Sequence, residues 1–562
     1  MHDLVSAMKA VEVRPQDPHA WATLGEALLQ VRQHGPAEEA FTRSLQLGPT
    51  ARGFTGWADS AVAVGEVSKA VGILTVARQR QLLAPAELRR LGELALEVGD
   101  LSAADGALEA YTAREPNDAL GWLLRGIVQT TLGSGDQALP LLDRAVSLAP
   151  ELPDAHANRA SVLEALSRLE DAEQSARAAL ARAPGHPLGS LCLARVLRRQ
   201  GRAEEALRVL DGLPDDGLTA AQVASRHGER GQCANALGEV ARAWASFSTM
   251  NAHARQQSAV SHGDSAGWFE RVTRIQALGP ALAHHACRPW QPPTNDHPPV
   301  FVVGFPRSGT TLLERILGAH PDLQATDEMS VTDQLFAQWN ELLPGVAAYP
   351  DGLLALEEAH RRKLRRHWFT LVQAERPQLN PQLRVIDKLP LNLVHLPLLH
   401  AIFPESPKIV LLRDPRDTAL SCFMQDFALG ATNNLMMSMD DIVMAQAQAF
   451  GAFAAVEATM AAHLQVVRYE SMVADLEGVA RPLLDAIGLA WSDQVLDHAR
   501  GLANTHIRTP SYARVLQPVD ASACNRWHQY ADHLRPWRAQ LDETAKRLGY
   551  PTEWPGDGAP RP

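Results

Sequence analysis

Small and basic residues gather in one short segment that follows an apolar run. The segment Gly304–Leu312 has the sequence GFPRSGTTL and comes directly after Val300–Val303. An apolar strand, a tight glycine loop and a helix form a typical phosphate site, because the loop N–H groups and the helix N-terminus converge on the anion. Gly304 and Gly309 have the spacing of an ATP-binding P-loop, but Thr310 stands where such a loop carries lysine. The segment predicts a phosphate site for a ligand other than an ordinary nucleoside triphosphate.

Charged side chains also follow two later apolar runs. Arg413 comes directly after Lys408–Leu412, and Ser421 lies eight positions further on, where it can face the same anion. Lys388 follows the short run that ends at Ile386. Ligands of parallel sheets bind past the carboxyl ends of the strands. We therefore expect these residues to lie near the glycine loop.

The second half alternates short apolar runs with helix-like segments. This alternation predicts an α/β domain with a parallel sheet flanked by helices on both faces. The expected strands are Phe301–Gly304, Arg384–Ile386, Lys408–Leu412 and Leu464–Val467.

The first half repeats every 34 residues, which is the period of the tetratricopeptide repeat (TPR). Alanine recurs at this step at Ala70, Ala104, Ala138, Ala172 and Ala206. Glycine does so at Gly65, Gly99, Gly133 and Gly201, with Ser167 in the missing place. The pattern predicts an all-α solenoid of roughly seven helix pairs from about residue 5 to 253, with a concave groove that binds a partner or scaffolds the protein.

A proline-rich segment separates the two halves. Gly279–Pro299 contains six prolines and breaks the repeat, so we expect a stiff linker with His284 and His285 in solvent. The expected divisions are a TPR solenoid over 1–255, a helical and proline-rich linker over 256–298, the α/β domain over 299–550 and a disordered tail over 551–562.

Composition limits the class of protein. A net charge of −11 argues against a general nucleic-acid binder. The five cysteines lack C-x-x-C spacing, so neither a zinc site nor a disulfide framework is predicted. Met1–Pro15 is not apolar, and no run of about 18 apolar residues exists. We expect a cytoplasmic protein without a secretory signal or membrane span, and a homo-oligomer is an open alternative to a monomer.

The loop Pro306–Thr311 resembles the 5′-phosphosulfate loop of sulfotransferases that use 3′-phosphoadenylyl sulfate (PAPS). The likeness is to protein-tyrosine sulfotransferases and their TPR-containing bacterial relatives, and it covers roughly residues 298–550. It implies a P-loop-like sulfotransferase domain with PAPS as co-substrate and no metal. The residues that it assigns to the phosphosulfate are Arg307, Ser308, Gly309, Thr310 and Thr311.

The resemblance assigns further roles. Arg413 and Ser421 match the 3′-phosphate site, and Lys388 matches a lysine that stabilises the charge on the leaving oxygen. Glu328 falls at the position of the general base that takes the acceptor proton, with Asp327 as the alternative. The implied catalytic residues are Glu328, Lys388 and Arg307. Structural alternatives are a surface turn at Arg413, a Lys388–Asp387 pair and a surface acid at Glu328, and weaker base candidates are His320 and His395.

The resemblance also covers the nucleotide's surroundings. Tyr469 matches a tyrosine near the nucleotide, and Glu470 is expected to orient backbone. Ser522–Trp527 resembles a loop that folds over the nucleotide, in which Ser522 and Arg526 bind it and Trp527 is alternatively a core residue. A glycine is common in the family where Asn525 stands.

The expected reaction moves a sulfuryl group from PAPS to a hydroxyl group. The expected acceptor is a protein tyrosine recruited by the TPR groove. Alternatives are a small-molecule or glycan hydroxyl, a P-loop kinase or NTPase, and a non-catalytic TPR scaffold.

Overall fold

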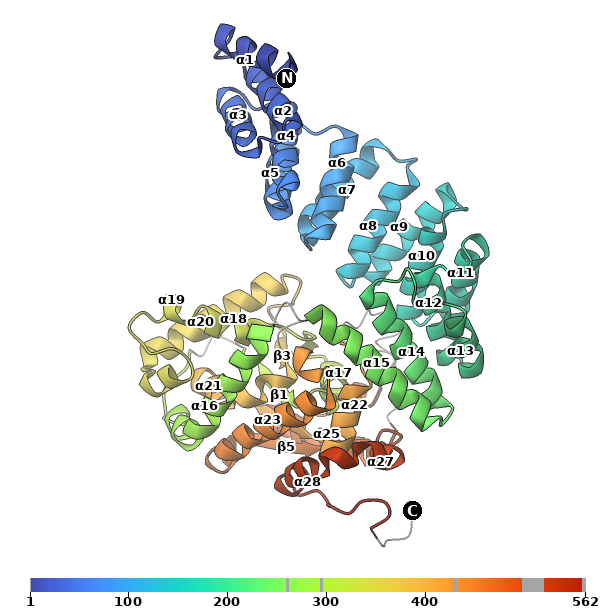
Figure 1. Cartoon of the computed structure of the whole chain (residues 1–562). Helices are drawn as coiled ribbons and strands as arrows, with labels where there is room; N and C mark the ends of the chain where they lie inside the picture. The colour runs from blue at the N-terminus through green and yellow to red at the C-terminus, as the bar shows by residue number, and fades with distance from the viewer. Residues whose placement is uncertain (1, 259–261, 294–296, 428–432, 498–519, 558–562) are drawn as a thin grey trace. The chain divides into compact units, whose positions relative to one another are not determined.

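The structure is a computed structural model that describes residues 2–258, 262–293, 297–427, 433–497 and 520–557. These residues divide into two compact units, Met1–Val196 and Leu197–Pro562. Figure 1 labels the helices and strands of both units along the chain. No helix within the described ranges is long and apolar enough to cross a membrane.

The first unit consists of paired helices. They are α1 His2–Val13, α2 Pro18–Gln30, α3 His34–Leu47, α4 Ala51–Ala63, α5 Val67–Gln79, α6 Pro85–Glu97, α7 Leu101–Arg114, α8 Ala119–Thr131, α9 Gly135–Leu148, α10 Pro153–Ala165, α11 Leu169–Arg182 and most of α12 Pro187–Arg199. Three more helices, α13 Ala203–Asp211, α14 Ala220–Ala236 and α15 Val240–Ser258, follow along the chain and belong to the second unit. The packed pairs α2–α3, α4–α5, α6–α7, α8–α9 and α10–α11 of the first unit, and α14–α15 of the second, confirm the predicted helical repeat.

Glycines of the repeat allow the helices to approach closely. A Cβ atom added at Gly25 of α2 or Gly56 of α4 would lie 2.7 Å or 2.2 Å from the ring of Phe41 in α3. The glycines of the turns have a second purpose, because Gly65 has a φ of 82°. Ser167, which replaces glycine in the 34-residue pattern, keeps this left-handed backbone with a φ of 60°. The repeat therefore reflects both close helix contacts and turn geometry.

The second unit contains a five-stranded parallel sheet with the order β2-β3-β1-β4-β5. The strands are β1 Val300–Gly304, β2 Leu323–Ala325, β3 Arg384–Lys388, β4 Lys408–Leu412 and β5 Leu464–Arg468. Four of them confirm the predicted strands and the parallel α/β class. The sequence missed β2, because its three residues LQA include no β-branched or aromatic side chain.

Helices and short 3₁₀ helices surround this sheet. The helices are α16 His262–Ala286, α17 Thr310–Gly318, α18 Val331–Ala337, α19 Trp339–Leu342, α20 Glu358–Glu375, α21 Leu396–Ile402, α22 Pro415–Phe423, α23 Met439–Met460, α24 Tyr469–Ala474, α25 Leu476–Ile487, α27 Ala531–Leu534 and α28 Arg538–Arg547. The 3₁₀ helices are η2 Asp351–Ala355, η3 Pro390–His395, η4 Asn433–Met436, η5 Ala461–His463, η6 Asp493–Asp497, η8 Arg526–Tyr530 and η9 Arg535–Trp537.

The central strand β1 contributes to a core on each face of the sheet. Phe301 and Val303 pack into one core, in which the Trp368 ring lies edge-on to Phe301 at 6.1 Å between centroids. Val300 and Val302 belong to the other core, together with buried residues of α17. Alternate residues of a strand point to opposite faces, so both faces of the sheet are covered as predicted.

The last helix pair is joined to the sheet domain within the second unit. The Gln232 side chain of α14 donates a hydrogen bond to the Met424 carbonyl at 2.8 Å. The Asn251 side chain of α15 donates to the Phe423 carbonyl at 2.9 Å, and Asn251 is 5% exposed. Both carbonyls lie at the end of α22, so α14 and α15 are fixed to the helix that carries Ser421.

The linker prediction differs from the structure at α16. This helix runs to Ala286 through Pro280, and its side chains are part of the same core as α23. A Cβ added at Gly279 would lie 2.5 Å from the Cβ of Ala455, so this glycine permits close helix packing. His285 is buried and bonds the Leu356 carbonyl at 3.1 Å, so its prediction as a solvated residue is wrong.

The predicted disordered tail also differs over 551–557. Trp554 is 3% exposed, and its indole N–H donates to Asp542 at 2.7 Å. Its ring lies 4.9 Å from the Trp527 ring. One large aromatic side chain therefore holds a segment whose composition suggested disorder, while 558–562 lie outside the described residues.

Candidate active site

The glycine loop joins β1 to α17. A Cβ added at Gly304 would lie 2.6 Å from the Leu411 carbonyl oxygen and 2.7 Å from the Ser308 hydroxyl. Gly309 has a φ of 103°, and a Cβ there would lie 2.5 Å from the Tyr469 ring. Both glycines are required by close approach, and Gly309 also by its left-handed backbone.

Polar groups of this loop are buried. Ser308 is 1% exposed, and its hydroxyl has no hydrogen-bond partner among the described residues. Thr310 and Thr311, which begin α17, are also buried. The first N–H groups of a helix have no partner within the helix. A buried hydroxyl beside a helix N-terminus is suited to bind an anion such as a phosphate group, because the hydroxyl and the free N–H groups can donate hydrogen bonds to it.

The predicted 3′-phosphate residues lie beside this loop. Arg307 donates from Nε to the Ser421 hydroxyl at 3.2 Å. Arg413 donates to the carbonyl oxygen of Arg307 at 2.9 Å and to that of Ala523 at 2.7 Å. Its guanidinium group lies 4.8 Å from the centre of the Tyr469 ring. The structure thus brings together residues from four separate segments of the chain.

The turn after β4 is held by Glu470. One oxygen of Glu470 accepts a hydrogen bond from the Asp414 N–H at 3.0 Å, and the other accepts from the Tyr550 hydroxyl at 2.9 Å. The expectation that Glu470 orients backbone is confirmed. Asp414 in turn caps α22 by accepting from the Arg416 N–H at 2.8 Å. These bonds fix the start of the helix that carries Ser421.

Asp417, which the sequence did not single out, holds the segment after 519. Its carboxylate accepts from the N–H groups of Asn525 at 2.7 Å and Trp527 at 2.8 Å. Burial raises the pKa of Asp417 to about 6. Asn525 has a φ of 58°, which explains why glycine suits this position and why asparagine is tolerated. The sequence held one indication of this role, because Asp417 is the second acid of the segment RDPRD at 413–417.

Ser522 and Arg526 differ in their surroundings. Ser522 is exposed and bonds Asp520 through both its hydroxyl and its N–H. The Arg526 guanidinium Nη2 atom lies 3.3 Å from the Met424 sulfur. Trp527 is 1% exposed, which supports the alternative that it is a core residue. Residues 498–519 lie outside the described ranges.

Lys388 lies between two glutamates at the end of β3. Its Nζ atom is 2.9 Å from Glu328 Oε1 and 3.7 Å from Glu314 Oε2. Lys388 and Glu314 are fully buried, whereas the Glu328 side chain is 46% exposed. Burial raises the pKa of Glu314. The arrangement places one carboxylate where an incoming molecule can reach it and fixes the ammonium beneath it.

The backbone distinguishes Glu328 from Asp327. Asp327 has a φ of 58° and forms an ion pair with Arg315, and its N–H donates to Glu314 at 2.9 Å. Arg376 donates to the Glu328 carbonyl at 3.2 Å. Asp327 is therefore occupied by structural contacts, while Glu328 meets Lys388. Sequence counting alone left this choice open.

Glu314 was also missed by the sequence analysis. It accepts the N–H groups of Thr326 at 3.2 Å and Asp327 at 2.9 Å through one oxygen. A signal was present, because Glu314 lies three residues before Leu317 and shares the buried face of the helix. A charged residue on an apolar face indicates a buried partner, which here is Lys388.

Asp387 is buried next to this cluster. It is 1% exposed, and neither carboxylate oxygen has a hydrogen-bond partner among the described residues. Burial, followed by the charge of Glu314, raises its pKa to about 7. Within the described ranges Lys388 pairs with Glu328 and Glu314 rather than with Asp387. The simple alternative of a Lys388–Asp387 pair is therefore not the observed arrangement.

The two histidines named as weaker bases have structural contacts. The His320 ring bonds the Ala490 carbonyl at 2.9 Å and accepts from the Asp322 N–H at 3.1 Å. The His395 ring bonds the Tyr349 hydroxyl at 2.8 Å, and burial lowers its pKa to about 3. Neither contact involves the glycine loop or Lys388.

Models of two known families match different parts of the chain. The model of the sulfotransferase family matches residues 298–493. The model of the tetratricopeptide repeat matches the overlapping segments 89–155, 128–187 and 157–218. A solved tetratricopeptide repeat protein from Parabacteroides merdae ATCC 43184 has a TM-score of 0.34 and 15% identity, over 44% of this chain and 93% of that one.

Two relatives are each similar to less than half of this chain. An uncharacterized protein of Aquifex aeolicus (strain VF5) is 28% identical over 264 residues, which are 45% of this chain and 33% of that protein. Protein-tyrosine sulfotransferase 1 of Danio rerio is 26% identical over 248 residues, which are 41% of this chain and 66% of that protein. Each match spans less than two thirds of the relative. The chain carries a domain of the sulfotransferase family, preceded by tetratricopeptide repeats.

Proposed function

We propose that this protein transfers a sulfuryl group from PAPS to an acceptor hydroxyl. The observation that carries the proposal is the buried Lys388 paired with the half-exposed Glu328, within a domain whose phosphate loop has Thr310 in place of the P-loop lysine. A fixed ammonium stabilises charge on a leaving oxygen, and an accessible carboxylate accepts a proton.

The donor is assigned to the glycine loop and its neighbours. In this proposal the 5′-phosphosulfate binds the loop residues Arg307, Ser308, Gly309, Thr310 and Thr311. The 3′-phosphate binds Arg413 and Ser421, and the nucleotide also contacts Tyr469, Ser522 and Arg526. Support comes from the Ser308 hydroxyl, which has no hydrogen-bond partner among the described residues, and from the hydrogen bond between Arg307 and Ser421.

The chemical step is an in-line displacement at sulfur. The acceptor oxygen forms the new S–O bond, and the bond from sulfur to the bridging oxygen of the phosphosulfate breaks. Glu328 takes the acceptor proton, while Lys388 and Arg307 stabilise the charge that develops on the phosphosulfate side. Adenosine 3′,5′-bisphosphate is the second product. Glu314 keeps Lys388 in place through their buried contact.

The proposed acceptor is a protein tyrosine recruited by the TPR array. Support comes from the relatives named protein-tyrosine sulfotransferase and from the binding role of concave helical repeats. A phenol has a pKa of about 10, so its proton leaves as the S–O bond forms. Radiolabelled PAPS incubated with enzyme and a lysate of the source organism should give labelled tyrosine sulfate. Label on carbohydrate alone would overturn the acceptor and leave the donor untouched.

Calorimetric titration tests the donor assignment. Adenosine 3′,5′-bisphosphate should bind more tightly than ATP with magnesium. Preference for ATP with magnesium would favour a kinase or NTPase, and binding of neither would favour a non-catalytic scaffold. K388A should keep bisphosphate binding but lower transfer by roughly 10²–10³-fold, as does loss of one donor to a developing anion. K363A, at an exposed lysine, is the matched control.

A further inference from the structure

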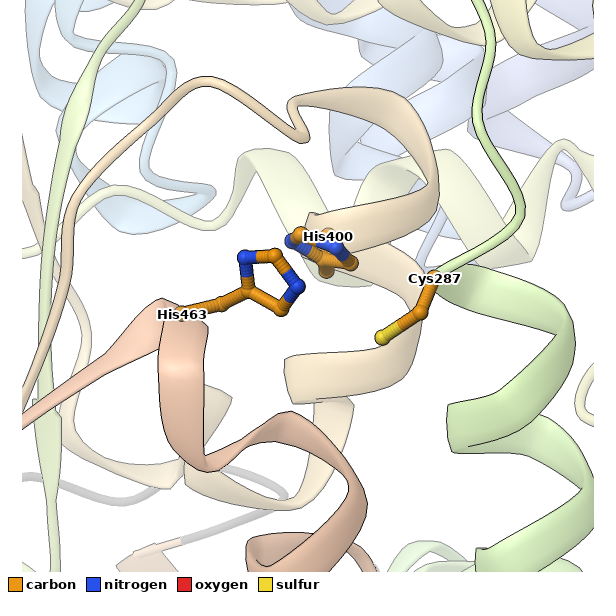
Figure 2. A group of neighbouring side chains, drawn as sticks. All are labelled: Cys287, His400 and His463. Atoms are coloured by element: carbon orange, nitrogen blue, oxygen red, sulfur yellow. The ribbon is translucent and has the colours of Figure 1, made fainter.

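Three metal-binding side chains meet in the second unit. They are Cys287, His400 and His463, and one ligand atom from each lies within 4.8 Å of the others. Figure 2 shows the Cys287 sulfur and the His463 ring pointing towards each other beneath the His400 ring. The two imidazole rings are 4.3 Å apart between centroids. The cluster gathers residues that are far apart in the sequence.

The cluster lies away from the candidate active site. Cys287 directly follows α16, His400 lies on α21 before β4, and His463 directly precedes β5. The first residues of β4 and β5, Lys408 and Leu464, pair with one another. The cluster thus belongs to the amino ends of these strands, whereas the glycine loop and Arg413 follow the carboxyl ends of β1 and β4.

The environment fits a borderline-soft cation. Zinc binds cysteine sulfur at about 2.3 Å and histidine nitrogen at about 2.0–2.1 Å, which puts tetrahedral ligand atoms about 3.5 Å apart. Side-chain rotation can bring the present atoms to that separation. His400 is 2% exposed, and its Nδ1 atom has no hydrogen-bond partner among the described residues. His463 is exposed, so water can reach a fourth position.

Two neighbouring cations are held by backbone carbonyl groups. The Lys408 ammonium donates to Phe403 O and Ser406 O, each at 2.7 Å. Arg361 donates to His285 O at 2.9 Å and to Ala286 O at 3.4 Å. These groups disfavour an added positive charge, so the negative thiolate of Cys287 is needed to offset them. Hard cations that prefer oxygen ligands are not suited to this set.

We propose that Cys287, His400 and His463 form a zinc-class site that fastens the end of α16 to the segments before β4 and β5. Water completes the coordination. Metal binding replaces the thiol proton of Cys287 with the metal and releases that proton to solvent. The site stabilises the domain and takes no part in sulfuryl transfer, so it does not depend on the proposed function.

The amino-acid sequence predicts no zinc site, because its cysteines lack the short ligand spacings of zinc motifs. The three residues are separated by more than 60 positions at every step, and such a set has no motif. The fold alone brings them together. A spacing rule detects ligands that share one loop or hairpin, so it does not test a set of this kind.

Cobalt titration of the full chain, after removal of metals with a chelator, tests the proposal. One Co²⁺ per chain should bind and give a thiolate-to-cobalt absorption band, which Zn²⁺ should then displace. C287S should abolish the band, and H463N should weaken Co²⁺ binding at least tenfold. H284N is the matched control, because His284 is an exposed histidine near the same helix end. It should bind as the unaltered chain does.

Thermal unfolding gives a second readout. Zn²⁺ should raise the unfolding midpoint of the unaltered chain and of H284N, but not that of H463N, because a ligand stabilises only the state that binds it. His463 is exposed, so H463N should fold. Equal binding by C287S, H463N and H284N would identify an adventitious ion only and overturn the proposal. Absence of the thiolate band would also overturn it.

Discussion

The two units of the chain bury different kinds of side chain. The core of the first unit is built from alanine, leucine and glycine contacts that recur with the repeat, and its ion pairs lie mostly on the surface. The second unit buries charged side chains at both ends of its sheet, among them Lys388 at the end of β3 and Lys408 at the start of β4. Removing charge from water is costly, so each such group needs partners in the fold. Periodic small and apolar residues characterise the first unit, and buried charge characterises the second.

The largest effect is expected at Glu328 in the second unit, whose replacement should lower transfer activity and leave the first unit unchanged. E328Q should lower transfer by roughly 10²–10⁴-fold, because the amide cannot accept the acceptor proton. Bisphosphate binding should persist. Labelled PAPS measures the transfer rate, and calorimetry measures bisphosphate binding. D327N should instead lower the unfolding midpoint, because Asp327 pairs with Arg315. If D327N abolished transfer and E328Q did not, the assignment of the base would be reversed.

The pH dependence of stability sharpens the contrast. Folded Asp387 has a pKa of about 7, whereas an unfolded aspartate titrates near 4. The folded state therefore holds this proton to a higher pH than the unfolded state does. The contribution of Asp387 to the free energy of unfolding is complete below about pH 4 and is lost as pH rises towards 7. The change is at most about 4 kcal/mol, at about 1.4 kcal/mol per pKa unit.

Replacing this carboxyl tests that direction. The free energy of unfolding of D387N should fall less steeply between pH 4.5 and 7.5 than that of the unaltered chain, as followed by tryptophan fluorescence in denaturant. E39Q, at an exposed glutamate of α3, should keep the slope of the unaltered chain. An unchanged slope in D387N would show that the buried carboxyl does not set it.

A smaller effect is expected at the proposed 3′-phosphate site. R413A should weaken bisphosphate binding by roughly 10–100-fold, because a hydrogen bond to a charged group contributes about 1.5–3 kcal/mol. Calorimetry measures this change directly. R366A, at an exposed arginine of α20, should bind normally. Normal binding by R413A would remove Arg413 from the site.

The smallest effect is expected on the stability of the first unit, with transfer activity unchanged. G56A should destabilise the repeats by about 1–3 kcal/mol, because its Cβ would lie 2.2 Å from the Phe41 ring. G72A is the matched control, since nothing lies within 4 Å of a Cβ at that exposed helix position. It should stabilise by roughly 0.5–1 kcal/mol. Circular dichroism measures both, and transfer activity should remain.

The sequence predicted what depends on local pattern. The 34-residue step identified the helix pairs, and apolar runs identified β1, β3, β4 and β5. Motif positions also indicated that Arg307, Ser421 and Arg413 share one place, which their contacts bear out. The helices and strands are predictable because residues close together in the chain determine them, whereas the grouping of Arg307, Arg413 and Ser421 followed from the rule that ligands bind past the carboxyl ends of parallel strands and from the family resemblance.

What the sequence could not predict depends on distant partners. Proline and glycine at 279 and 280 suggested a linker, but Ala455 packs against them in a helix. Trp554 orders a segment of tail-like composition by contact with Trp527. The choice between Asp327 and Glu328 required the left-handed turn at Asp327. Each result depends on a neighbour that pattern alone does not name.

The bonds from α14 and α15 to the end of α22 have a consequence for dissecting and recombining such proteins. The side chains of Gln232 and Asn251 donate hydrogen bonds to the carbonyl groups of Met424 and Phe423. A truncation near residue 255 would remove α14 and α15 from the sheet domain, and these two carbonyl groups would lose those hydrogen bonds. A transplantable catalytic cassette should begin near Leu197 instead. The helix pair α14–α15 should therefore be kept with the sheet domain, and repeats should be exchangeable between such chains only before residue 197.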